Sequence, residues 1–126
     1  MSFDAFMFTP HKQAAFVELA RVIRPGGRLA MTSWDFHSQP ANRPPQVADH
    51  RPLVELAGLT VLGYDETENW RERCMVFTDF LDSHASDLAE EADATVEEVR
   101  EGLTDMRDSI ECMSRRFMLV AERSPG

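Results

Sequence analysis

The sequence contains few of the residues that mark several common classes of protein. Cysteine occurs only at Cys74 and Cys112, which form neither a disulfide framework nor a Cys-x-x-Cys metal motif. No apolar run approaches the roughly 18 residues that a membrane-spanning helix needs. The first residues lack the basic start and long apolar stretch of a signal peptide. We therefore expect reduced, partly buried cysteines, no membrane partner and a cytoplasmic location.

Basic residues are also scarce. Thirteen Lys and Arg stand against 22 Asp and Glu, which gives a formal net charge of −9. Such a negative field repels phosphate backbones, so we expect no nucleic-acid partner. The acidity is local, because residues 65–112 hold sixteen acidic and four basic side chains. We interpret this segment as the solvated faces of helices; the alternative is a docking surface for a basic protein.

The four histidines show no pattern typical of a metal site. His11, His37, His50 and His84 have no ligand spacing among themselves or with the two cysteines. We therefore predict exposed or helix-capping histidines, with His84 packed on an apolar stripe, and no bound metal.

The first part of the chain alternates strand and helix signals. Residues 3–8 are apolar and rich in aromatics, which predicts a buried strand. Thr9 and Pro10 have the character of a helix N-cap and first turn, and apolar residues repeat at helical spacing as far as Ile23. Pro25-Gly26-Gly27 ends this helix, and residues 28–34 form a second strand, parallel to the first.

A proline-rich loop over residues 36–45 leads into the second part. We predict a short helix over 49–56 that Gly58 ends, and a strand over 59–64 with a bulge at Gly63. Capping-box spacing at Asn69 begins a long amphipathic helix, and a second capping box at Thr95 begins another. Residues 117–121 form a closing strand.

The two amphipathic helices are expected to pair as a hairpin. Each carries an apolar stripe at three- and four-residue steps, so Phe77 and Leu81 of the first should face Val99, Leu103 and Met106 of the second. The predicted fold class is therefore α/β, with about four strands in a single domain over residues 1–126. An acidic helical hairpin is inserted over about 69–113.

Several of these segments together resemble the second half of class I S-adenosylmethionine-dependent methyltransferases, whose sheet is Rossmann-like. The segments are Phe3-Asp4-Ala5-Phe6, the helix over 16–23, the turn Arg24-Pro25-Gly26-Gly27, the strand that follows, residues 56–67, Trp70-Arg71-Glu72-Arg73 and residues 116–121. They occur in the family's order and cover essentially the whole chain. The Arg-Pro-Gly-Gly turn is the most specific of them.

The resemblance implies S-adenosylmethionine as cofactor and candidate residues for its site. Thr9 and His11 match the segment that faces the cofactor, although simple capping by Thr9 is the structural alternative. Trp34, Asp35 and Phe36 end a strand where open parallel sheets bind ligands; they line a pocket or pack on the hairpin. Trp70 covers a substrate cavity or belongs to the core.

One family element does not occur in the sequence. A methyltransferase holds its cofactor on a glycine-rich loop after the first strand, where backbone approaches the ligand closely. The six glycines form no Gly-x-Gly loop, and Gly26-Gly27 lies after a helix and before a strand. The chain resembles the family from its fourth strand onward, so the cofactor-binding half is expected to be missing. We assign no catalytic residue, because methyl transfer needs positioning more than acid or base groups.

Three functions fit these features. The first is part of a methyltransferase for a small molecule, inactive as this chain alone. The second is a non-catalytic, dimeric binding module derived from that fold, and the third is a small enzyme of unrelated chemistry. The edge of the strand over residues 3–8 predicts a homodimer, because it carries no lysine or proline that would block pairing. The other expected partner is a missing amino-terminal half.

Overall fold

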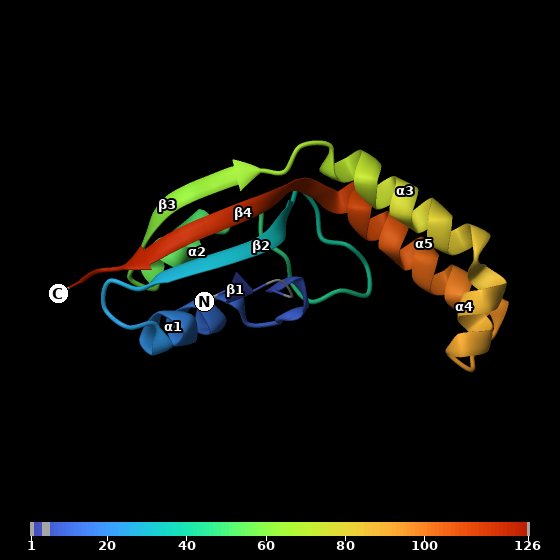
Figure 1. Cartoon of the computed structure of the whole chain (residues 1–126), viewed down its shortest axis with the longest axis horizontal. Coiled ribbons are helices and arrows are strands. Elements are labelled where there is room, and N and C mark those ends of the chain that lie inside the picture. Colours follow the sequence, from blue (N-terminus) through green and yellow to red (C-terminus); the bar gives the residue numbers. More distant parts are fainter. Residues whose placement is uncertain (1, 4–5, 126) are drawn as a thin grey trace. The chain divides into compact units, whose positions relative to one another are not determined.

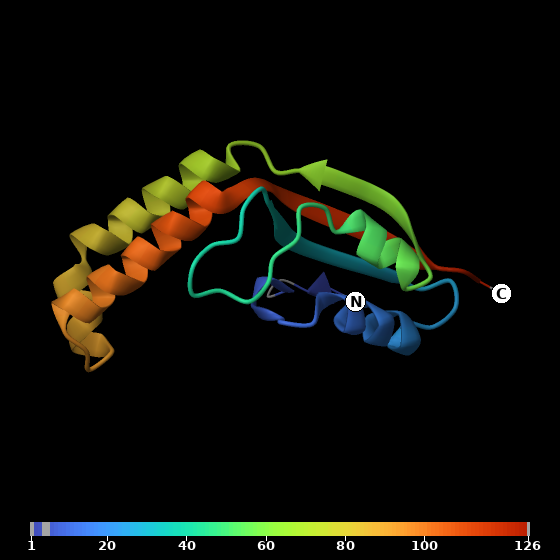
Figure 2. The ribbon, with the colours of Figure 1, turned by 180° about the vertical axis from the view of Figure 1, so that it is seen from behind.

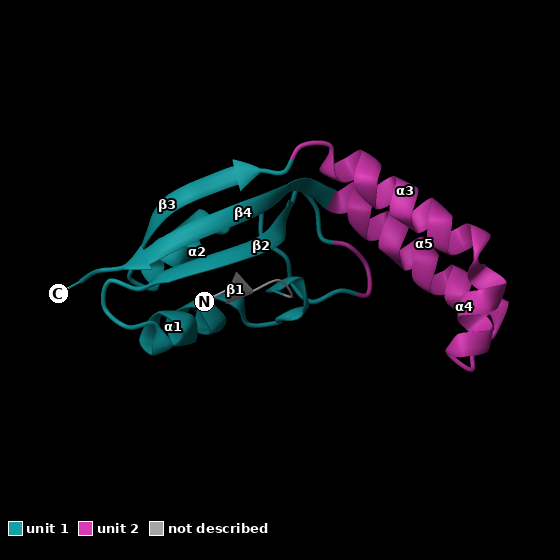
Figure 3. Ribbon diagram, in the orientation of Figure 1, with its two compact units in different colours: residues 1–39, 43–67, 113–126 teal, residues 40–42, 68–112 magenta. Residues whose placement is uncertain are grey.

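The computed structural model describes the backbone of residues 2–3 and all atoms of residues 6–125. The chain forms two compact units (Figure 3). Unit 1 comprises residues 1–39, 43–67 and 113–126, and unit 2 comprises residues 40–42 and 68–112. Among the described residues, no helix is both long and apolar enough to cross a membrane.

Unit 1 is built on a four-stranded sheet in the order β1-β2-β4-β3 (Figure 1). The strands are β1 (Ser2–Phe3), β2 (Arg28–Phe36), β3 (Leu59–Glu66) and β4 (Met113–Arg123). β1 runs parallel to β2, as the strand-helix-strand pattern predicts, whereas β4 runs antiparallel to both of its neighbours. Unit 1 therefore has a mixed four-stranded sheet, in agreement with the predicted α/β fold class.

Two helices cover one face of this sheet, α1 (Lys12–Val22) and α2 (Arg51–Leu56), as Figure 2 shows from behind. Alternate residues of the strands point to that face, which is why burial along β2 follows a period of two. The resulting core contains Phe6, Phe16, Ala20, Ile23, Leu29, Met31, Val54, Leu59, Phe117, Leu119 and Ala121. Gln13 also links the two helices by donating from Nε2 to the Leu53 carbonyl at 3.0 Å.

The amino-terminal segment corrects two expectations. The predicted strand over residues 3–8 is shorter, because Phe6–Phe8 forms a 3-10 helix; residues 4 and 5 lie outside the described part. Thr9 does not cap α1, since the helix begins at Lys12 with His11 at the N-cap. The Thr9 N–H instead closes the preceding turn on the Phe6 carbonyl at 3.1 Å. The homodimer through this edge stays a prediction.

Glycines shape the turns of unit 1 as the sequence predicts. Gly26 and Gly58 have φ of 78° and 89°, conformations that other residues adopt only with strain, and they follow α1 and α2. The bulge predicted at Gly63 is present as a register shift between Val61 and Gly63 of β3.

Lys12 holds the proline-rich loop against unit 1. Its side chain is 5% exposed, and Nζ donates to the carbonyls of Thr9 and Pro45, each at 2.8 Å. Gln46 adds a bond from Nε2 to the Met7 carbonyl at 2.8 Å. Burial lowers the pKa of the Lys12 ammonium, but these backbone acceptors satisfy its donors.

Unit 2 contains three helices, α3 (Trp70–Ser83), α4 (Ala85–Glu91) and α5 (Val96–Cys112). The predicted single helix is therefore two, because the chain leaves helical geometry at His84, where φ is −112°. The capping box at Asn69 is wrong: Asn69 has a φ of 56° and makes no side-chain cap. At Thr95 the cap forms, since Oγ1 accepts from the Glu98 N–H at 3.1 Å.

The contact between α3 and α5 uses a different face of α3 from the one predicted. Thr78 is buried there, and its hydroxyl donates to the Cys74 carbonyl at 2.7 Å and lies 3.5 Å from Met106 Sδ. Phe77, predicted to face α5, is 57% exposed. Leu103 of α5 is buried as predicted, and Ile110 is buried as well. Cys74 and Cys112 are half-buried, also as expected.

Candidate functional site

Four polar side chains of unit 1 meet at the carboxyl end of β2. The Asp35 carboxylate is fully buried and accepts from three groups: His50 Nδ1 at 2.7 Å, Arg115 Nε at 3.0 Å and the Tyr64 hydroxyl. Tyr64 lies 2.8 Å from Oδ1 and 2.6 Å from Oδ2. The same hydroxyl accepts from the backbone N–H of His50 at 3.2 Å. We call these four residues the Asp35 cluster.

The strands place these groups by register and alternation. Asp35 follows Leu29, Met31 and Ser33 on the inward side of β2, so its carboxylate enters the core. Arg115 of β4 lies directly opposite Asp35 in the ladder. His50 stands at the N-cap position of α2 without a side-chain cap, which frees its ring to turn inward. The cluster therefore joins β2, β3, β4 and the start of α2.

The surroundings of Tyr64 keep its hydroxyl protonated. Burial, and then the hydrogen bond to Asp35, raise the pKa of Tyr64 far above its usual range, so the phenol stays neutral. The Arg115 guanidinium balances the Asp35 charge. Two arginines also lie over the Tyr64 ring, Arg51 at 4.7 Å and Arg115 at 5.6 Å from its centroid.

Aromatic rings enclose the His50 imidazole. The centroids of Phe117, Phe6 and Phe16 lie 5.0, 5.7 and 6.3 Å from the His50 ring, which is fully buried. Because Nδ1 donates to the Asp35 carboxylate, the ring orientation is fixed. His50 Nε2 is buried and has no hydrogen-bond partner among the described residues.

This arrangement can position groups but offers no free nucleophile. Both Asp35 oxygens are already occupied by donors, and the Tyr64 proton is directed to that carboxylate. An imidazole held by a carboxylate is a common way to orient a base. Here the ring is enclosed in the core, so the cluster fixes the local geometry of the strand ends.

The six residues predicted for the site lie in different places. Asp35 is the centre of the cluster, and Phe36 is buried beside it at the end of β2. Trp34 is half-buried on the opposite side of β2, with the Arg116 guanidinium 4.3 Å above its ring. Thr9 is half-buried and His11 is exposed, both before α1. Trp70 is buried in unit 2.

Three members of the cluster were missed from the sequence. His50 was expected to be exposed or capping, but it is completely buried, because its Nδ1 donates a hydrogen bond to Asp35 inside the core. Arg115 lay outside the predicted strand over 117–121, although β4 begins at Met113. The available signal was Asp35 itself: a carboxylate at an inward strand position needs buried donors.

The described residues do not fit S-adenosylmethionine by themselves. A cradle for it needs free peptide N–H groups on a loop between a strand and a helix. Gly26, Gly27 and Gly58 lie between a helix and a strand, and their N–H groups donate to the carbonyls of Arg123, Arg24 and Glu55.

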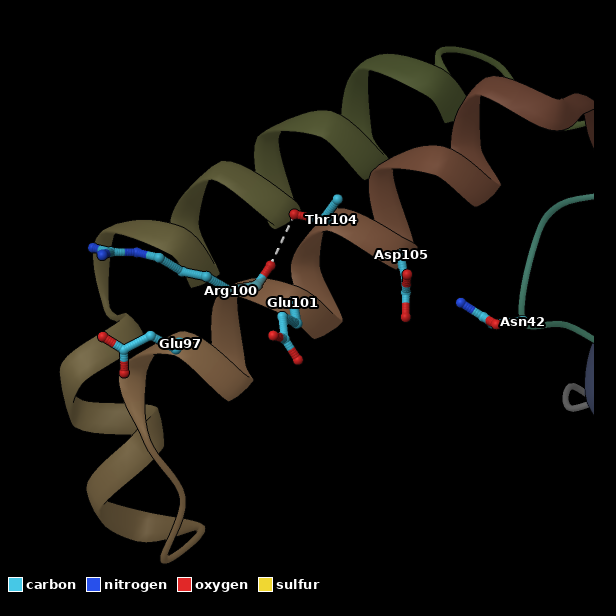
Figure 4. A pocket seen from close by; sticks show the side chains of 6 residues that line it. All are labelled: Asn42, Glu97, Arg100, Glu101, Thr104 and Asp105. Atoms are coloured by element: carbon cyan, nitrogen blue, oxygen red, sulfur yellow. Dashed lines mark hydrogen bonds between the residues drawn. The ribbon is translucent and has the colours of Figure 1, made fainter.

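A hollow with a volume of about 560 Å³ lies along α5 in unit 2 (Figure 4). It is lined by Asn42, Glu97, Arg100, Glu101, Thr104 and Asp105, and Thr104 is bonded to the Arg100 carbonyl at 3.0 Å. Among residues 2–3 and 6–125, no group of three or more His, Cys, Asp or Glu is placed to hold a metal ion.

Comparisons with known proteins identify the fold. No protein-family model matches the sequence, and no curated protein matches it either. Among solved structures, the chain superposes on the [4+2]-cyclase SpnF with a TM-score of 0.75 and 19% identity, over 99% of this chain and 49% of SpnF. A second match is a protein from Galdieria sulphuraria described as a sarcosine dimethylglycine methyltransferase. Its TM-score is 0.72 and its identity 18%, over 98% of this chain and 51% of that one.

A third match is phosphoethanolamine N-methyltransferase 2 of Haemonchus contortus, solved with phosphomonomethylethanolamine and S-adenosylhomocysteine. Its TM-score is 0.61 at 11% identity, over 98% of this chain and 32% of that one. The chain thus spans about half or less of the length of these structures. Its fold matches part of the fold of the class I S-adenosylmethionine-dependent methyltransferases.

Proposed function

We propose that this chain is the acceptor-side part of an S-adenosylmethionine-dependent methyltransferase that acts on a small molecule. The observation that carries the proposal is the superposition of nearly the whole chain on about half of a methyltransferase structure. In this proposal, residues outside this chain supply the glycine-rich cofactor cradle, and the chain alone is inactive.

The Asp35 cluster supports an acceptor-side role. It lies at the carboxyl end of β2, the edge where open parallel sheets bind their ligands. Direct displacement of a methyl group depends on holding donor and acceptor in line. A buried set of bonds between 2.6 and 3.2 Å keeps the ends of three strands in one geometry, which is the support that such positioning needs.

Calorimetric titration of S-adenosylmethionine into the pure chain tests the first half of the proposal. We expect no saturable heat. The peptide N–H groups of Gly26, Gly27 and Gly58 already donate hydrogen bonds to backbone carbonyls of the chain, and association carries an entropic cost. Micromolar binding to this chain alone would show that it carries its own cradle.

A chimera tests the second half. The stretch of the Galdieria sulphuraria protein that this chain matches is replaced by the chain, and both cofactor binding and methyl transfer to a panel of small amines, carboxylates and phenols are measured. We expect the chimera to bind S-adenosylhomocysteine and to methylate at least one acceptor. A folded chimera that binds the cofactor but methylates nothing would contradict the acceptor-side role.

The alternative is a non-catalytic binding module with the same fold. One observation favours it: every Asp35 oxygen is taken by groups of the chain itself, as in a purely structural network. The chimera decides between the two, since a binding module gives no methyl transfer.

A further inference from the structure

Helix α3 of unit 2 presents three large apolar side chains to water. Val76, Phe77 and Phe80 are 68%, 57% and 56% exposed, although they lie within five residues of one another. We call them the α3 strip. A groove of about 530 Å³ runs along the strip and is also lined by Asn69, Glu72 and Arg73. Exposed apolar side chains that gather on one surface mark interaction sites, whereas single ones need no explanation.

The strip is not the inner face of the helical unit. The contact of α3 with α5 uses Thr78, which is buried and whose hydroxyl lies 3.5 Å from Met106 Sδ. Residues 73, 76, 77 and 80 are three or four positions apart and therefore share another side of the helix. The strip is thus an additional apolar surface of α3, separate from the packing within unit 2.

Charge in unit 2 is strongly one-sided. Residues 68–112 contain fourteen acidic and four basic side chains. Three of those bases are engaged inside the unit: Arg71 with Glu111 at 3.9 Å, Arg100 with Asp82 at 3.7 Å, and Arg107 with Asp79 at 3.1 Å. The excess of carboxylates leaves a negative field around the helices.

One carboxylate, that of Glu72, lines the groove itself. Asp79, about two turns further along α3, is 70% exposed and pairs with Arg107 of α5 at 3.1 Å. Arg73 is the basic residue of the lining. A guanidinium at that end of the groove complements the carbonyl groups at the carboxyl end of a docked helix.

We propose that the α3 strip binds a basic amphipathic helix of another protein. The partner's apolar side chains at i, i+3, i+4 and i+7 enter the groove around Phe77 and Phe80, and its lysines or arginines face Glu72 and the excess of carboxylates in unit 2. Charge complementarity selects this occupant over a second copy of the chain, because a second unit 2 carries the same negative excess. The proposal is independent of the methyltransferase function.

The experiment uses a labelled 14-residue helical peptide of leucine and lysine in amphipathic order, titrated with the full chain by fluorescence anisotropy at 150 mM salt. We expect saturable binding that Phe80→Ser and Phe77→Ser each weaken at least tenfold. The matched control is Leu56→Ser in unit 1, which removes an apolar side chain that is 78% exposed and should leave binding unchanged. Circular dichroism verifies that each variant keeps its helices.

Four outcomes would overturn the proposal. The peptide fails to bind at millimolar concentration, or it binds Phe80→Ser as tightly as the parent chain. A peptide with glutamate in place of lysine binds equally well, so that charge has no part in recognition. Alternatively, sedimentation shows a dimer of the chain that Phe80→Ser dissociates, which would make a second copy the occupant of the strip.

Discussion

Asp35 and Asp79 each accept from an arginine at about the same distance, 3.0 and 3.1 Å, yet they stand in opposite surroundings. Asp35 in unit 1 is completely buried, whereas Asp79 in unit 2 is 70% exposed. Phenylalanine shows the same contrast: Phe117 of unit 1 is fully buried and Phe77 of unit 2 is 57% exposed. In both comparisons the side chain of unit 1 is enclosed and the side chain of unit 2 is in contact with water.

We therefore expect an aspartate–arginine ion pair to contribute differently to stability in the two units. A buried ion pair is costly to break, since removal of one partner leaves the other charge desolvated and unpaired. An exposed pair is screened by water and salt and contributes little. Stability is therefore expected to depend on the interior of unit 1, and recognition on the surface of unit 2.

The largest expected effect comes from the aromatic core of unit 1. Phe117→Ala should lower the free energy of unfolding by about 3–5 kcal/mol, because the ring is fully buried and packs on Tyr64 and His50. Phe77→Ala is the matched control and should change it by less than about 1 kcal/mol. Urea denaturation measures both; equal losses would mean that the two phenylalanines are equally buried in solution.

The next effect concerns the two carboxylates. Asp35→Asn should destabilise the chain by about 3 kcal/mol, the lower end for a broken buried pair, since Arg115 is one-third exposed and keeps part of its hydration. Asp79→Asn should cost less than about 1 kcal/mol. A double-mutant cycle that adds Arg115→Gln measures the coupling free energy between Asp35 and Arg115. A coupling of zero would show that their ion pair does not cause the loss of stability in Asp35→Asn.

A pH titration follows Tyr64 directly, because it is the single tyrosine of the chain. The pKa of Tyr64 is higher in the folded protein than in the unfolded chain, where it is about 10. The protonated phenol therefore makes its full contribution to stability below a pH of about 10, and this contribution is lost as the pH rises above that value. We expect no phenolate absorbance near 295 nm at pH 10.5 while the chain is folded, and ordinary titration in urea. If the phenol of the folded chain instead ionised at about pH 10, Tyr64 would be exposed to water and the prediction would be wrong.

The smallest effect is expected in the ion pairs of unit 2. Arg107 reaches Asp79 at 3.1 Å and Asp82 at 3.5 Å, and both carboxylates are exposed by 40% or more. Arg107→Gln should lower stability by about 0.2–1 kcal/mol in dilute buffer. The difference from the parent chain should vanish in 1 M NaCl; a difference that persists there would reveal packing by the side chain and not charge.

Local features of the fold could be predicted from the sequence. Helix α1 and its Pro25-Gly26-Gly27 stop, the parallel second strand and the bulge at Gly63 follow from spacing and from glycine's conformational freedom over a few residues. The orientation of α3 could not be predicted, because the helix carries apolar residues on two sides and spacing alone does not say which side meets α5.

The Asp35 cluster was hidden because its members are far apart in the chain. Asp35 was selected for its place at a strand end, but His50, Tyr64 and Arg115 come from three other elements that only tertiary packing brings together. Arg115 and Arg116 were taken to precede the last strand, since charged residues weaken a strand signal. Pairing with β2 extends β4 through them nonetheless.

The bulge in β3 has a consequence for comparing this chain with remote relatives. Val61 pairs with Ala121 and Tyr64 with Leu119, two inward positions of β4, so Val61 and Tyr64 share the core face although they are three residues apart. In a regular strand an odd spacing would send them to opposite faces. An alignment that matches β3 residue by residue to an unbulged strand would therefore pair Tyr64 with an outward-facing position. The gap belongs at residues 62–63, and only with that gap does the tyrosine align with side chains that can reach a carboxylate in the core.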